Sequence, residues 1–211
     1  MSYNLQEFDR QVQNLLAKGY PQLFNKSPEK FQEKLEKLKT FVPEVGEPAI
    51  EEGKLPFVIV VKSINGEAET LMDLVDRDGK KGFSKMYPHE AKVFIPIDNV
   101  ILPDDFAYLL LDIDRGKDTL NVRPDEAFKI IKARNRSPLT IDEGIALITQ
   151  YPEFLIRNNC YSLLASRCPG NKRVPAIWIN ASKRPNLGWC WDGNPHTWLG
   201  SASCSERIDT D

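Results

Sequence analysis

The sequence predicts an α+β fold, in which a mixed or mainly antiparallel sheet has helices grouped beside it and a pair of helices comes first. Apolar residues recur at helical spacing near the N-terminus and again between residues 124 and 150. Other apolar runs, rich in β-branched and aromatic residues, have the length of strands. The two kinds of element do not alternate regularly, which argues against a doubly wound parallel sheet.

The first forty residues contain the pattern of two amphipathic helices. Leu5, Phe8 and Val12 recur on one face of the first helix. Ser27 followed by Pro28 is a capping sequence that opens the second helix. Charged residues fill the remaining positions, so each helix is expected to bury one apolar stripe.

The segment 43–54 indicates an exposed linker, because it is rich in proline, glycine and glutamate. We therefore divide the chain into an N-terminal helical appendage, residues 1–45, and a single α+β domain, residues 46–211. A length of 211 residues is consistent with one main domain.

Four apolar runs are the main strand candidates. Residues 55–61 are continuously apolar, which predicts a central strand buried on both faces. Residues 93–97 are expected near a sheet edge, because Pro96 lacks an N–H for the ladder. Residues 106–113 and 173–179 give two further strands.

Two helices are predicted in the middle of the chain. Pro124 opens the first, with acidic residues in its first turn. Thr140 and Glu143 have the spacing of a capping box that opens the second. The final residues, 205–211, are polar and are expected to fray.

Composition sets limits on location and partners. No apolar run approaches the roughly 18 residues of a membrane span, and no secretory signal is visible, so we expect a cytoplasmic protein without a membrane partner. A net charge of −2 provides no overall attraction to nucleic acid. The four cysteines are expected to be reduced thiols.

The strongest functional signal is the stretch 187–204, which holds three of the four tryptophans, two of the four cysteines and one of the two histidines. Its glycines and proline predict a backbone shaped by turns. We interpret it as the wall of a binding pocket. The predicted ligand-binding residues are Trp189, Trp191, Asn194, His196, Trp198 and Arg173.

The segment 154–191 suggests which ligand that pocket accepts. It contains six basic residues and no acidic one, with aromatic residues between them. Basic groups favour anions, and aromatic faces stack on flat rings. A small anionic or aromatic ligand is therefore expected, and single-stranded nucleic acid remains an alternative.

Two other functions remain open. Cys190 or Cys204 could act with His196 in an enzyme, either as a thiol nucleophile or with metal assistance. Zinc ligands normally lie two to four residues apart, and no two cysteines here do, so no metal site is predicted and no cofactor is indicated. The third alternative is a structural or interaction domain whose N-terminal helices bind a protein partner.

Three segments, 137–144, 173–178 and 188–203, resemble a family of bacterial proteins catalogued only as a domain of unknown function. The resemblance covers roughly residues 50–207. It implies a soluble bacterial protein and supplies no catalytic residue.

Overall fold

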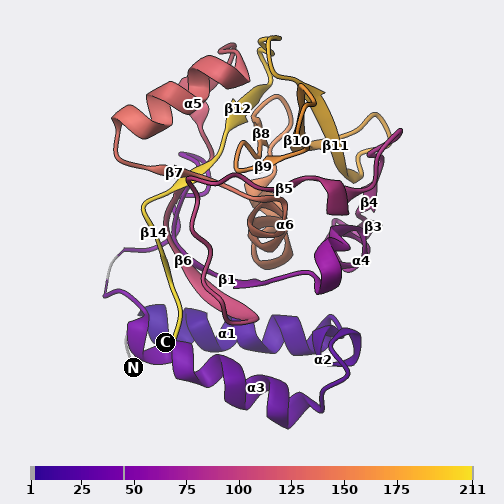
Figure 1. Cartoon of the computed structure of the whole chain (residues 1–211). Helices are drawn as coiled ribbons and strands as arrows, with labels where there is room; N and C mark the ends of the chain where they lie inside the picture. The colour runs from indigo at the N-terminus through magenta and orange to yellow at the C-terminus, as the bar shows by residue number, and fades with distance from the viewer. Residues whose placement is uncertain (1–2, 45, 211) are drawn as a thin grey trace.

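The structure is a computed structural model that describes residues 3–44 and 46–210 (Figure 1). Within them, the first sheet has the order β1-β6-β13-β7, and β14 also pairs with β6. The second has the order β12-β8-β10-β11-β4, and most pairs are antiparallel, which confirms the α+β prediction. The strands of these sheets are β1 (Lys54–Val61), β4 (Phe83–Ser84), β6 (Ala107–Asp114), β7 (Ser137–Pro138), β8 (Cys160–Ser162), β10 (Arg173–Ile179), β11 (Pro185–Trp191), β12 (Leu199–Ser201), β13 (Ser203–Cys204) and β14 (Glu206–Ile208).

Two small ladders and six helices complete the described chain. The ladders join β2 (Asp76–Arg77) to β3 (Lys80–Lys81) and β5 (Ile95–Pro96) to β9 (Ser166–Arg167). The helices are α1 (Tyr3–Ala17), α2 (Tyr20–Leu23), α3 (Pro28–Glu36), α4 (Ala68–Met72), α5 (Pro124–Ala133) and α6 (Ile141–Gln150). Short 3-10 turns cover Lys37–Phe41, Ile64–Gly66, Ala91–Val93, Lys117–Thr119 and Pro152–Phe154.

Helix α6 lies at the centre of the fold, between β1 of the first sheet and β10 of the second (Figure 1). It begins at the predicted capping box: the Thr140 hydroxyl accepts from the Glu143 amide, and the Glu143 carboxylate accepts from the Thr140 amide. The helix buries nearly all of its residues, because elements pack on all of its sides.

Strand β1 is buried as predicted, but it is an edge strand, so the prediction of a central position is wrong. Its free edge is covered by Gln11 of α1. The Gln11 Oε1 accepts from the Ile59 amide at 2.8 Å, and its Nε2 donates to the Phe57 carbonyl at 3.4 Å. A helix side chain thus takes the place of a neighbouring strand.

The N-terminal helices pack below the first sheet (Figure 1). Phe8 of α1 and Phe31 of α3 are fully buried and belong to the same apolar core as β1 and β6. Burial alone would raise the pKa of Glu7 on α1, but hydrogen bonds from Arg10 and Tyr151 outweigh this and lower the pKa. Apolar and polar contacts therefore both hold these helices against the body.

Three local expectations differ from the structure. The run 93–97 forms only the two-residue strand β5, because a 3-10 turn occupies Ala91–Val93. The stretch 187–204 is more regular than expected, since it contains the end of β11 and the whole of β12 and β13. Within 205–211, β14 pairs with β6 instead of fraying, and residue 211 lies outside the described residues.

No helix in the described part of the chain is both long and apolar enough to cross a membrane.

Candidate functional site

The β10–β11 hairpin positions the candidate site. Arg173 pairs with Trp191 and Pro175 pairs with Trp189, so these residues share one face of the hairpin. Successive residues of a strand point to opposite faces, so Cys190 lies on the other face. The register therefore brings together three of the predicted ligand-binding residues, Arg173, Trp189 and Trp191.

These three side chains form a cationic and aromatic cluster, which we call the Arg173 face. The Arg173 guanidinium carbon lies 4.3 Å from the ring centroid of Trp189 and 4.7 Å from that of Trp191. The two rings meet edge to face, with their centroids 5.2 Å apart. Trp191 is 42% exposed, so ring surface in the cluster is open to solvent. Cation–π contacts of this kind hold an arginine in place without neutralising it.

The guanidinium keeps unused donors. Its Nη1 donates to the Asn171 side-chain oxygen at 3.3 Å, whereas its Nε is buried and has no hydrogen-bond partner. Among the described residues, no acidic side chain forms an ion pair with Arg173. The cluster therefore presents a positive charge without an anionic partner among residues 3–44 and 46–210.

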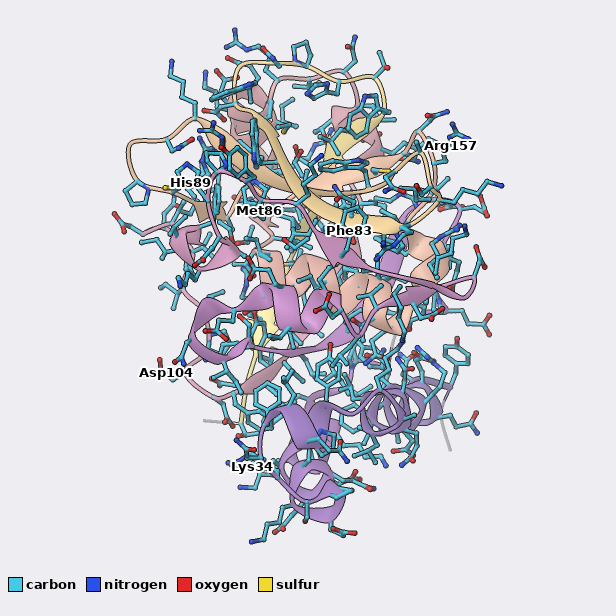
Figure 2. All side chains as sticks on the ribbon, turned by 90° about the vertical axis from the view of Figure 1, so that its right-hand side faces the viewer. Lys34, Phe83, Met86, His89, Asp104 and Arg157 are labelled. Carbon is cyan, nitrogen blue, oxygen red and sulfur yellow. The ribbon has the colours of Figure 1, made fainter. Side chains whose placement is uncertain are left out.

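A distant segment completes this face. Residues 85–89 follow β4, which pairs with β11 in parallel. Phe83, Met86 and His89 mark this part of the chain in Figure 2. The Trp189 indole nitrogen donates to the Tyr87 carbonyl at 2.9 Å. The His89 Nε2 lies 3.0 Å from the Asn171 amide nitrogen. Sequence reasoning missed Tyr87, His89 and Asn171, because no local pattern indicates a pairing with β11.

The other predicted ligand-binding residues lie elsewhere. On the opposite face of the hairpin, the Trp198 ring packs 6.0 Å from Trp178 and 5.2 Å from His196, centroid to centroid. Trp178 covers Gly188, where an added Cβ would lie 2.3 Å from the indole ring. Asn194 is exposed in the loop between β11 and β12. The six predicted residues thus divide between two faces and a loop.

The basic residues of the segment 154–191 are also dispersed. Arg184 stacks on the Phe83 ring at 4.5 Å and donates to backbone carbonyls. Arg167 forms an ion pair with Asp192 at 3.0 Å. In Figure 2, Arg157 lies at the opposite side of the view from His89. Arg173 is therefore distinguished by its position against two tryptophan rings, whereas Arg184 is likewise partly buried and without an ion pair among the described residues.

Cys160, Cys190 and Cys204 are buried in surroundings that suppress thiolate formation. Cys190 is buried, with its Sγ 3.8 Å from the Ser162 hydroxyl, and burial raises its pKa to about 11. Burial raises the pKa of Cys204 to about 12. All four cysteines are free. In the part of the chain that the structure describes, no group of three or more His, Cys, Asp or Glu residues could hold a metal ion.

Labelling with iodoacetamide at pH 7.5 is expected to modify Cys168, which is partly exposed, well before Cys190 and Cys204. The reason is that a buried thiol with a pKa near 11 has less than about one part in a thousand of thiolate at this pH. Peptide mass spectrometry over time would follow each site, with urea-unfolded protein as the control. Rapid labelling of Cys190 in the folded protein would contradict this account and favour a thiol enzyme.

Comparison with known proteins gives a family and no activity. No curated protein and no solved structure matches the chain. One family model, described as "Family of unknown function (DUF5701)", matches residues 14–210. This match confirms the resemblance seen in the sequence and extends it into α1. The chain therefore belongs to the family of unknown function DUF5701.

Proposed function

We propose that the protein binds a small ligand that carries an anionic group beside a flat ring, and that the Arg173 face is its binding site. The observation that carries the proposal is the arrangement of Arg173 over two tryptophan rings, with no acidic partner in the described part of the chain and with Trp191 open to solvent. We also propose that the protein works in the bacterial cytoplasm, as expected from the sequence.

The charge arrangement favours an anion on the ligand. A guanidinium presents its donors in a planar fork that matches a carboxylate or a phosphate. Arg173 donates once to Asn171 through Nη1, and because its unpartnered Nε is buried, its terminal nitrogens are the donors that remain for an anion. Because the rings of Trp189 and Trp191 restrict its motion, little side-chain entropy remains to be lost on binding.

The exposed indole favours a flat ring next to that anion. Trp191 is among the few large apolar side chains of the described residues that remain exposed, and Tyr87 at 82% exposure is another. Ring stacking on an aromatic side chain contributes about 0.5–1.5 kcal/mol beyond burial. The Arg173 face holds one arginine, which supports a small ligand over a polyanion that requires several phosphate contacts.

Titration with three matched compounds tests this proposal. Benzoate has a ring and a charge, benzamide has the ring alone, and acetate has the charge alone. We expect saturable shifts of the tryptophan indole NMR signals with benzoate, at a Kd of about 1 mM or tighter, and much weaker effects with the other two. Arg173→Met and Trp191→Ala should each weaken benzoate binding at least about tenfold.

Arg157→Met is the control. It removes an exposed arginine that lies at the opposite side of Figure 2 from His89, so it should leave benzoate binding unchanged. Equal affinity for benzoate in wild type and Arg173→Met would exclude the Arg173 face as the site. Absence of saturation by benzoate in the wild type would contradict the proposed ligand class.

A further inference from the structure

A second feature of interest is a cavity at the start of α6, whose lining includes no residue of the Arg173 face. A cavity of about 110 Å³ opens between this helix end, the segment 63–68 and the segment 91–102. Phe94, Pro96 and Leu102 are among its apolar walls, whereas Ser63, Asp142 and Ser166 supply polar groups. The cavity therefore combines an apolar wall with a carboxyl group, as sites for small organic molecules commonly do.

Only one of the two carboxylate oxygens of Asp142 accepts hydrogen bonds from the described residues. Its Oδ2 accepts hydrogen bonds from the Ser63 amide at 2.9 Å and from the Ser63 hydroxyl at 3.1 Å. Its Oδ1 has no hydrogen-bond partner among the described residues, and no basic side chain there lies within ion-pair distance. Burial raises the pKa of this carboxyl, and the hydrogen bonds from Ser63 and the charge of Lys62 offset only part of that rise.

The nearest cations are held by other groups. Lys92 lines the cavity, but its ammonium pairs with Glu90 at 2.6 Å. Lys62 donates to the backbone carbonyls of Pro103 and Asp104, both at 2.8 Å. The chain thus builds a carboxylate into a cavity and directs its own ammonium groups elsewhere.

We propose that this cavity binds a small primary alkylamine as its ammonium ion, with Asp142 as the counter-charge and the apolar wall around the alkyl chain. An ammonium has three donors, which suits the free Asp142 oxygen and the Ser166 hydroxyl, since both residues line the cavity. Ser166 is buried and its oxygen already accepts from the Ile141 amide at 3.0 Å, so it is fixed in place. The volume suits about four heavy atoms, since one water takes about 30 Å³.

Titration of the full chain with propylammonium chloride tests the proposal, with propan-1-ol and potassium chloride as matched comparators. The readout is the ¹H–¹⁵N NMR shift of the Ser63 and Ile141 amides, which lie at the cavity. We expect saturation with propylammonium alone. Asp142→Asn should weaken this binding at least tenfold, whereas Asp104→Asn, which changes an exposed carboxylate outside the cavity, should leave it unchanged.

A second variant keeps the test decisive if Asp142→Asn folds poorly. Leu102→Trp would fill the cavity and leave Asp142 in place, so it should also abolish saturation. The proposal fails if propylammonium gives no saturable shift, or if either cavity variant binds it as the wild type does. Equal saturation by potassium or by propan-1-ol would also overturn it. None of these outcomes depends on the Arg173 face.

Discussion

Replacing Arg207 with methionine is expected to lower the free energy of unfolding by about 3–5 kcal/mol, because it leaves a buried carboxylate without its counter-charge. Glu143 is fully buried, and the Arg207 Nη2 lies 2.9 Å from its Oε2. The Tyr108 hydroxyl donates to the same carboxylate at 2.8 Å. The pair joins β14 to the start of α6, so its loss should weaken both. Urea unfolding followed by circular dichroism measures the change.

Arg134→Met is the matched control, since its ion pair with Asp118 is exposed on both sides and should be worth less than about 1 kcal/mol. The double variant Glu143→Gln with Arg207→Met should recover part of the lost stability, because it also removes the buried charge. A loss in Arg207→Met no larger than that in Arg134→Met would show that the buried pair does not hold β14 in place.

Replacing Gly116 with alanine is expected to cost about 3 kcal/mol or more, because two separate penalties combine. Gly116 has a φ of +88°, which an alanine adopts only with strain. Its Cβ would also lie 2.2 Å from the Ser201 carbonyl oxygen, which is backbone and has little freedom to move. Thermal unfolding would report the loss as a lower Tm.

Gly170→Ala separates the two penalties. Gly170 has a φ of +73°, and an added Cβ there meets nothing within 4 Å, so only the strain of roughly 1 kcal/mol applies. The difference between the two variants measures how tightly the turn after β6 packs on β12. Equal losses of stability in the two variants would show that the contact between Gly116 and Ser201 rearranges without a cost.

Local signals in the sequence predict where a helix begins, but they do not predict which distant residues its side chains contact. The Thr140 and Glu143 spacing identified the start of α6, because a capping box is complete within four residues. The partner of the buried Glu143 is Arg207, 64 residues later in the chain, and no pattern in the polar tail indicates it. The sequence therefore predicts that the polar tail frays, although strand β14 lies within it.

The candidate site was predicted in part for a similar reason. Trp189 and Trp191 alternate around Cys190, which is the period of a strand, but the surrounding glycines and proline favoured turns. The strand register then decides which side chains meet, and a shift by one residue reverses the faces. This is why Arg173 joins two of the tryptophans, while Trp198 and His196 lie on the other face.

The contact between Gln11 and β1 has a consequence for self-assembly. An uncovered strand edge is a template on which another chain can add a strand, and such growth leads to amyloid-like fibres. Residues 57–61 are apolar, rich in valine and free of charge and proline, which is the composition that fibre-forming segments share. One glutamine amide occupies the backbone groups at which that growth would begin. Helix α1 is therefore expected to hinder strand addition at this edge as well as adding to the core.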